Sequence, residues 1–275
     1  MQKTHIKSLV ISGASSGIGL ALARHYLVRG AVVAAFARRG ELLQTLAAEF
    51  PNKVFCYTVD VRDASAIQQA ANDFMARVGV PDVVIANAGV SRGTLTEYAE
   101  DIDAFQQVFD INVMGMVKTF QPFLNAMREA TKLPSPLKGR GIEGEGRAFS
   151  PTLVGIASVA GFRGLPGSGA YSASKAAAIS YLESLRVELR DTGVKVVTIC
   201  PGYIKTPMTA VNPYPMPFIL DAEEAAQRMA KVIERGCSFA VIPWQMGLVG
   251  RAMKLLPNWL YDLILKNATY KPRNF

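Results

Sequence analysis

Residues 7–27 read KSLVISGASSGIGLALARHYL, and this stretch determines the fold of the chain. A short apolar strand at 7–11 leads into a glycine-rich turn, Gly13-x-x-x-Gly17-x-Gly19, and a helical pattern follows from Leu20. Glycines let a backbone turn approach a phosphate, and the next helix presents free N–H groups at the positive end of its dipole. The spacing differs from the general G-x-G-x-x-G fingerprint. Its place between a strand and a helix still predicts a turn that binds the pyrophosphate of a dinucleotide.

The rest of the chain alternates apolar strands with helices. Strands are expected at 31–36, 54–59, 83–86, 153–157, 194–200 and 239–242, and helices at 41–50, 63–78, 97–128, 168–190 and 221–235. This alternation predicts βαβ units. We therefore expect an α/β fold, in which residues 1–242 form a single domain with a doubly wound, Rossmann-type parallel sheet flanked by helices. The carboxyl ends of its strands, at Gly13, Arg38, Asp60 and Asn87, would line one crevice.

The second predicted strand ends in Ala37-Arg38-Arg39. NAD-specific domains of this type carry an acid here for the ribose 2′-hydroxyl, whereas arginine accommodates a 2′-phosphate. Because the acid is missing and positive charge takes its place, the sequence predicts that NADP(H) is preferred over NAD(H). The alternative is that Arg38 and Arg39 are ordinary surface residues.

Acid–base chemistry is expected around Ser158 and Tyr171-x-x-x-Lys175. The i, i+4 spacing of Tyr171 and Lys175 on a predicted helix places both side chains on one face. A nearby ammonium lowers the pKa of a tyrosine, ordinarily about 10, toward the range in which general acid–base catalysis is efficient. Ser158 follows a strand at the edge where open sheets bind ligands, so its hydroxyl is a candidate partner for a substrate oxygen. The alternative is a chance pair on a solvated helix.

Four features depart from the regular pattern. Asn112 lies inside the predicted helix at 97–128, where an asparagine marks a kink, a buried hydrogen bond or a structural core position. Residues 131–151 are rich in Gly and Pro and predict a flexible loop insertion. Residues 207–220, apolar and broken by prolines, suggest an apolar substrate lid or an ordinary packed connection. The apolar and basic extension at 243–275 is equally suited to a pocket wall, a subunit contact or an interfacial membrane segment.

Composition excludes several classes of function. The chain has 275 residues, half of them hydrophobic, and a net charge of +8 that suggests anionic ligands or membrane surfaces only weakly. Its basic residues are scattered, which disfavours nucleic acid as a partner. The three cysteines, Cys56, Cys200 and Cys237, lack metal-site spacing, so we expect no metal site, reduced thiols and a cytoplasmic location. With only His5 and His25, a Ser-His-Asp hydrolase is excluded. We also expect neither a signal peptide nor a membrane-spanning helix.

Taken together, the motifs resemble those of the short-chain dehydrogenase/reductase family over roughly residues 7–242. They occur in the family's order, and Ser12 replaces the usual threonine while keeping its hydroxyl. The motifs are Ser12-Gly13-x-x-x-Gly17-Ile18-Gly19, Asp60-Val61, Asn87-Ala88-Gly89, Asn112, Ser158, Tyr171-x-x-x-Lys175 and Pro201-Gly202. The resemblance implies an oxidoreductase that transfers a hydride between NADP(H) and a carbonyl or secondary alcohol.

The resemblance also implies a role for each motif. In the implied catalytic tetrad, Tyr171 protonates the carbonyl oxygen, Ser158 holds that oxygen, Lys175 bonds the nicotinamide ribose, and Asn112 holds a water that links Lys175 to solvent. The implied cofactor contacts are Gly13, Ser15, Ser16, Ile18 and Gly19 at the pyrophosphate turn, Arg38 and Arg39 at the 2′-phosphate, Asp60 and Val61 at the adenine, Asn87, Ala88 and Gly89 near the ribose, and Pro201, Gly202, Ile204 and Thr206 near the carboxamide. Tyr171 and Lys175 of the tetrad are implied cofactor contacts as well.

The substrate is expected to be a small apolar ketone, a 3-oxo compound or the corresponding alcohol. One alternative is a reductase of lipid-like 3-oxo substrates that contacts a membrane peripherally through the extension at 243–275. Another is a cofactor-sensing binding protein without turnover, although such a protein would be expected to have lost Tyr171, Lys175 or Ser158. The family resemblance further suggests a homo-oligomer, a dimer or tetramer built on the helices that carry Asn112 and Tyr171.

Overall fold

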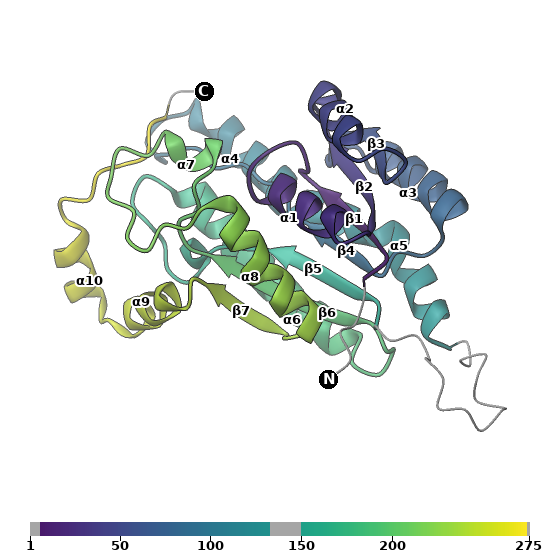
Figure 1. The fold of residues 1–275 in the computed structure, drawn as a ribbon. Helices are drawn as coiled ribbons and strands as arrows, with labels where there is room; N and C mark the ends of the chain where they lie inside the picture. The colour runs from purple at the N-terminus through teal and green to yellow at the C-terminus, as the bar shows by residue number, and fades with distance from the viewer. Residues whose placement is uncertain (1–5, 133–149, 274–275) are drawn as a thin grey trace.

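The computed structural model describes residues 6–132 and 150–273, which form one α/β domain around a parallel sheet (Figure 1). The sheet has the order β3-β2-β1-β4-β5-β6-β7, and every neighbouring pair is parallel. The strands are β1 (Ser8–Ser12), β2 (Val32–Ala37), β3 (Val54–Thr58), β4 (Val83–Ala86), β5 (Thr152–Ile156), β6 (Lys195–Pro201) and β7 (Phe239–Ile242). The order reverses between β1 and β4, and such a switch point opens a ligand crevice at the carboxyl ends of the strands.

Helices cover both faces of the sheet. On one face lie α1 (Gly17–Val28), α2 (Gly40–Glu49) and α8 (Ala222–Arg235), and on the other α3 (Ala64–Val78), α5 (Gly115–Lys132) and α6 (Gly169–Glu188). Within β1 the side chains of Leu9 and Ile11 join the first core, while Val10 joins the second. Because successive strand residues point to opposite faces, a strand covered on both sides is apolar throughout, as β1 is.

The predicted helix at 97–128 is interrupted. Helix α4 (Asp101–Phe109) passes into a π-helical segment, η1 (Asp110–Met114), before α5 begins. Asn112 lies in this segment and is 1% exposed. A π turn widens the backbone spacing locally and is frequent at functional sites. Helix α5 continues to Lys132, so the first two residues of the predicted insertion are helical, and its residues 133–149 lie outside the described residues.

The C-terminal extension is helical and packs against the β5–α6 loop (residues 157–168). It contains α9 (Trp244–Leu255) and α10 (Asn258–Leu265). The Arg163 guanidinium donates to the carbonyl oxygens of Met253 and Leu256, and the Tyr261 hydroxyl donates to Gly164 O at 2.7 Å. Neither α9 nor α10, nor any other helix among the described residues, is long and apolar enough to cross a membrane.

Candidate active site

The glycine-rich turn joins β1 to α1 at the switch point. Gly13 has φ +71°, and a Cβ there would lie 2.8 Å from the Cα of Ala88, so a side chain would strain the backbone and collide with the next loop. The N-cap residue of α1, Ser16, makes no side-chain capping bond, which leaves first-turn N–H groups available for an anion. These features fit a pyrophosphate. Gly19 packs behind the turn, where a Cβ would lie 2.3 Å from Gly13 O.

An arginine from the end of β2 reaches this turn. Arg39 Nη2 donates to Ser15 Oγ at 3.1 Å and to Ser16 Oγ at 2.9 Å. Arg38 lines the same pocket. The loop therefore gathers two guanidinium groups and two hydroxyls beside the phosphate turn, with no carboxylate at the end of β2. A phosphate monoester matches this donor set better than a diol does.

The side chains of two predicted cofactor residues make hydrogen bonds within the protein. The Asp60 carboxylate accepts hydrogen bonds from Arg62 Nε and from Arg62 Nη2 at 2.7 Å, and these bonds hold its pKa below the ordinary value. Asn87 Nδ2 donates to Ser12 O at 3.0 Å and to Gly13 O at 3.2 Å. The Asn87 side chain therefore fixes the phosphate turn to β4, a structural task that the sequence motif alone does not reveal.

Ser158, Tyr171 and Lys175 all line this pocket and lie close together. Ser158 follows β5, and its Oγ accepts the Ala160 N–H at 3.1 Å. Tyr171 lies in the first turn of α6. Lys175 is buried, its Nζ donates to Ile156 O at 2.8 Å, and that Nζ lies 5.8 Å from the centre of the Tyr171 ring. A proton donor, a second hydroxyl and an ammonium thus converge from two consecutive elements.

The pKa values in this cluster differ from the expectation. Burial raises the pKa of Tyr171 above its ordinary value, and a hydrogen bond with Ser158 offsets part of the rise. Burial also lowers the pKa of Lys175 to about 8. The expected lowering of the Tyr171 pKa by Lys175 is therefore wrong, because burial disfavours both the phenolate and the ammonium.

Asn112 lies behind the cluster and does not line the pocket. Its Oδ1 accepts the Val90 N–H at 2.8 Å, and its Nδ2 donates to Val90 O and to Ser174 Oγ, each at 3.0 Å. The side chain thus joins the loop after β4 to α6. This bears out the predicted buried hydrogen bond, while the water that Asn112 would hold beside Lys175 stays a prediction.

Sequence comparison identifies the family. The model of the family described as "short chain dehydrogenase" matches residues 7–214. The chain belongs to the short-chain dehydrogenase family. It is accordingly an oxidoreductase that uses a nicotinamide cofactor and acts on CH–OH groups.

Individual proteins match over nearly the whole chain. An uncharacterized oxidoreductase of Myxococcus xanthus is 38% identical over 265 residues, which cover 95% of this chain and 97% of that protein. The fold is also that of a short-chain dehydrogenase from Burkholderia cenocepacia in complex with NADP, with TM-score 0.77, 24% identity, and coverage of 96% and 99%. A relative from Burkholderia phymatum in complex with NAD has TM-score 0.77, 21% identity and full coverage of both chains.

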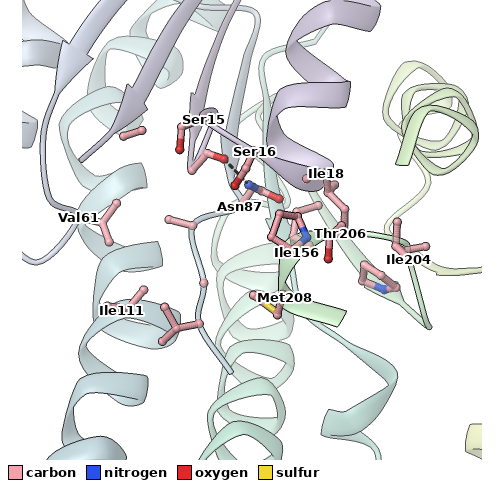
Figure 2. A pocket seen from close by; sticks show the side chains of 18 of the residues that line it. Ser15, Ser16, Ile18, Val61, Asn87, Ile111, Ile156, Ile204, Thr206 and Met208 are labelled. Carbon is pink, nitrogen blue, oxygen red and sulfur yellow. Dashed lines mark hydrogen bonds between the residues drawn. The ribbon is translucent and has the colours of Figure 1, made fainter. Parts of the chain in front are cut away.

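In this short-chain dehydrogenase, one pocket gathers most of the predicted site residues. All the predicted residues line it except Gly19 and Asn112, whose positions behind the pocket are described above. Figure 2 shows Val61 and Ile111 on one side and Ile204 and Thr206 on the other. Met208 and Thr209, from the predicted lid segment at 207–220, also line it, whereas the sequence reasoning missed Phe36, Val59, Ile111 and Ile156. Their apolar neighbours in sequence give no signal that separates a pocket wall from the core.

Proposed function

We propose that the chain is an NADP(H)-dependent reductase of apolar ketones or 3-oxo compounds, which also catalyses the reverse oxidation. The observation that carries this proposal is that Ser158, Tyr171 and Lys175 line the same pocket as Arg38 and Arg39. The arginines follow β2 and Ser158 follows β5, and β1 and β4 lie between these strands, so the reacting groups and the 2′-phosphate donors lie apart along the site. A nicotinamide dinucleotide phosphate matches such an arrangement in charge and in the order of its parts.

The cofactor-holding residues follow from the geometry of the chain. The Gly13 turn and the start of α1 would hold the pyrophosphate, the Arg39–Ser15–Ser16 group the 2′-phosphate, and Val61 the adenine face. Ile204 and Thr206, after β6, would orient the nicotinamide end. When bound, the nicotinamide supplies the hydride, and the chain supplies orientation and the proton.

Proton transfer is the task of the chain's own side chains. In the reductive direction the Tyr171 hydroxyl donates its proton to the substrate oxygen, and a raised pKa keeps this hydroxyl protonated at neutral pH. Ser158 holds the same oxygen through its hydroxyl. Lys175, with a pKa of about 8, exchanges a proton readily near neutral pH and restores the one that Tyr171 loses. Asn112 fixes the loop and helix that carry these groups.

An apolar substrate is favoured by the segment at 207–220. It contributes Met208 and Thr209 to the pocket, and none of its residues is fully buried. Tyr214 of this segment lies within electrostatic reach of Tyr171: burial chiefly, then the neighbouring Tyr203 and Tyr171, raise its pKa to about 12. The segment thus covers the reacting groups with apolar and aromatic side chains while remaining loosely packed. These properties suit a cover for a hydrophobic substrate.

A panel of carbonyl compounds tests the proposed activity. With NADPH as cofactor, the kcat/KM for 3-oxo esters is expected to rise about fourfold for each added methylene. The reason is that burying one CH₂ group contributes about 0.8 kcal/mol. A charged 3-oxo acid of equal length serves as the matched control and should react more slowly. Tight NADPH binding without turnover of any carbonyl, or of any alcohol with NADP, would support a binding protein without catalysis instead.

A second candidate function, reduction of lipid-like 3-oxo substrates at a membrane surface, is supported by α9 and α10. Trp244, Leu248 and Leu255 recur at helical spacing along the exposed side of α9, and Leu255 is 85% exposed. Trp259 and Leu263, spaced i, i+4, are likewise exposed on α10. Arg251 is exposed on the same side of α9, and the basic residues Lys254 and Lys266 lie near these apolar residues in the sequence. Apolar and aromatic side chains beside positive charge suit the surface of an anionic bilayer.

Liposome flotation tests this second candidate. The intact protein is expected to float with vesicles rich in anionic lipid and not with neutral ones, and Trp244→Ser with Trp259→Ser should abolish flotation. Val28→Ser, which removes an exposed apolar residue from α1, is the control. Absence of flotation by the intact protein removes the membrane hypothesis. If the wild-type protein is a dimer and the tryptophan variant dissociates into monomers, these exposed apolar residues form a subunit contact instead.

We also infer a homo-oligomer built on the helices near Asn112 and Tyr171. These helices leave Ile102, Met114 and Val187 exposed, and such side chains are commonly covered by another subunit. A monomer by light scattering at micromolar concentration would contradict this.

A further inference from the structure

The segment after α10 returns across two loops at the carboxyl edge of the sheet (Figure 1). These are the β4–α4 loop (residues 87–100) and the β5–α6 loop. Lys271 Nζ donates to Ser91 Oγ at 3.0 Å, and Gly93 N–H donates to Pro272 O at 3.3 Å. A Cβ on residue 93 would lie 2.3 Å from Lys271 O, so only glycine allows this close approach. Chain ends are ordinarily loose unless they are tied down, and this one is tied to the first loop.

Arg273 makes the strongest contacts of the segment. Its Nε donates to Asp101 Oδ2 at 2.9 Å, and its Nη2 donates to Asp101 Oδ1 at 3.2 Å and to Glu100 Oε1 at 3.0 Å. Its guanidinium carbon also lies 3.5 Å from the centre of the Tyr98 ring. A two-pronged bond to a carboxylate combined with stacking on an aromatic face is specific to arginine. We call the contacts of Arg273 with Tyr98, Glu100 and Asp101 the C-terminal clasp.

Asp101 connects the clasp to the β4–α4 loop. Its side chain is 1% exposed although it lies close beneath the surface, and its Oδ2 also accepts the Leu95 N–H at 2.7 Å. The bond from Arg273 and the bond from Leu95 hold the pKa of Asp101 below its ordinary value. A carboxylate screened from water depends on such donors. Without Arg273, the carboxylate would keep only the Leu95 N–H and would turn toward solvent, displacing Leu95 and its neighbour Thr94.

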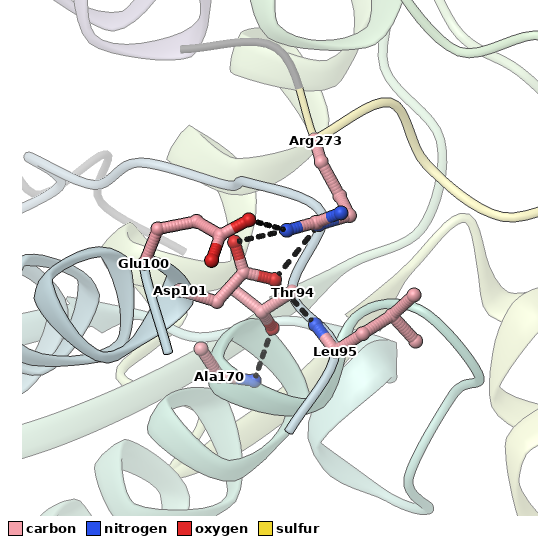
Figure 3. A network of polar contacts seen from close by, with 6 residues as sticks. All are labelled: Thr94, Leu95, Glu100, Asp101, Ala170 and Arg273. Carbon is pink, nitrogen blue, oxygen red and sulfur yellow. Dashed lines mark hydrogen bonds and ion pairs between the residues drawn. The ribbon is translucent and has the colours of Figure 1, made fainter. Parts of the chain in front are cut away.

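Thr94, the neighbour of Leu95, joins the same loop to the catalytic helix. Its N–H donates to Gly167 O at 3.1 Å, and its Oγ1 accepts the Ala170 N–H at 3.2 Å. Ala170 directly precedes Tyr171 in the first turn of α6. Figure 3 shows the continuous path from Arg273 through Asp101 and Leu95 to Thr94 and Ala170. A hydrogen-bonded chain of residues thus runs from the C-terminal segment to the start of α6.

We propose that Arg273 is a positioning residue, which fixes the first turn of α6 through Asp101 and Thr94 and thereby aims the Tyr171 hydroxyl at the substrate. The inference rests on the proposed role of Tyr171 as the proton donor. A misplacement of about 1 Å at a reacting group costs about 100-fold in rate. No residue of the clasp and neither Leu95 nor Thr94 lines the cofactor pocket. Loss of the clasp therefore acts on the chemical step and leaves cofactor affinity unchanged.

Substitution of Arg273 tests the proposal. In Arg273→Met, the kcat for the best carbonyl substrate is expected to fall about 10-fold or more, since partial misplacement approaches the 100-fold limit, while the NADPH Kd stays constant. Amide exchange at Leu95 and Ala170 should accelerate in the same variant. Arg273→Lys keeps the charge but not the forked geometry and should recover part of kcat. Arg190→Met, which removes an arginine from an exposed pair with Asp191, should change neither property.

A second variant separates positioning from general stability. Thr94→Val removes the hydroxyl bonded to Ala170 without touching the tail, so it also serves if Arg273→Met fails to fold. Residues on one path do not have additive effects, and the double variant should be no slower than the slower single one. Three outcomes would overturn the proposal. The first is an additive loss of kcat in the double variant, and the second is an unchanged kcat and unchanged amide exchange in Arg273→Met. The third is weaker NADPH binding in Arg273→Met together with faster exchange throughout β1 and α1.

Amide exchange also separates failure of this inference from failure of the proposed reductase. It needs no substrate, so the effect of Arg273→Met on Leu95 and Ala170 can be measured in a protein that turns over nothing. A wild-type protein without turnover refutes the reductase, and with it the role of Tyr171. Unchanged exchange in Arg273→Met beside an active wild type refutes only the clasp.

Discussion

Tyr171→Phe is expected to lower kcat for carbonyl reduction by about 1,000-fold, within the range attributed to general acid catalysis. The substitution removes only the hydroxyl oxygen, which hydrogen-bonds with Ser158 in a pocket where burial keeps the phenol protonated. Lys175 does not replace the lost phenol as the direct donor to the substrate, because its Nζ donates to Ile156 O and lies 5.8 Å from the centre of the Tyr171 ring. Stopped-flow measurement of NADPH oxidation checks the prediction.

Binding and turnover should separate in this variant. The NADPH Kd, measured by fluorescence, is expected to stay within about twofold, since the phosphate turn and the arginines are untouched and a change below ~0.5 kcal/mol is usual for a site away from the contact. Tyr181→Phe is the matched control, because Tyr181 lies on the same helix but outside the pocket. If Tyr171→Phe turns over substrate at a near wild-type rate, Tyr171 is not the proton donor and the proposed mechanism is refuted.

Replacing both Arg38 and Arg39 with alanine is expected to weaken NADPH binding by about 100-fold or more and to leave NADH binding nearly unchanged. Hydrogen bonds to charged groups contribute about 1.5–3 kcal/mol each, and 1.4 kcal/mol corresponds to a tenfold change in Kd. Arg39 already lies against Ser15 and Ser16, so it requires little rearrangement to meet a phosphate. Calorimetric titration of both cofactors gives the ratio directly.

Single variants show how much each arginine contributes to NADPH binding. Arg39→Ala should account for at least half of the lost binding free energy, because Arg39 alone is hydrogen-bonded to the phosphate turn, and Arg38→Ala for the remainder. Arg24→Ala removes an exposed arginine paired with Glu49 outside this pocket and should alter neither affinity. If the wild-type protein binds NADH as tightly as NADPH, the two arginines are surface residues. The search for a substrate should then begin with alcohols and NAD.

The architecture was predictable because its signals are local. Strands buried on both faces are continuously apolar, and β4 and β7 coincide with the predicted ranges 83–86 and 239–242. The glycine-rich turn at Gly13 needs a positive φ, which a sequence records directly as glycine. Right-handed crossovers then limit the possible strand orders to a few, and the structure decides among them.

The sequence predicted which residues line the site better than it predicted their contacts. Motif residues follow strand ends, and strand ends meet at one edge, so the pocket gathers Ser158, Tyr171 and Lys175. The sequence did not show that Asn87 holds the phosphate turn, that Asp60 pairs with Arg62, or that the Tyr171 pKa rises. Hydrogen-bond partners and pKa values depend on burial and on the distances between side chains, which no spacing rule contains.

The C-terminal clasp shows where sequence reasoning ends. The pattern of apolar and basic residues after 242 left a pocket wall, a subunit contact and a membrane segment equally open. Arg273 and Asp101 are separated by 172 positions and carry no motif, so only the folded chain brings them together. The sequence by itself determined the parallel sheet, the phosphate turn and the chemical groups of the site, because local periodicity and backbone sterics encode them. The tertiary structure alone decided the partners of those groups, because long-range packing sets each side chain's neighbours and its access to water.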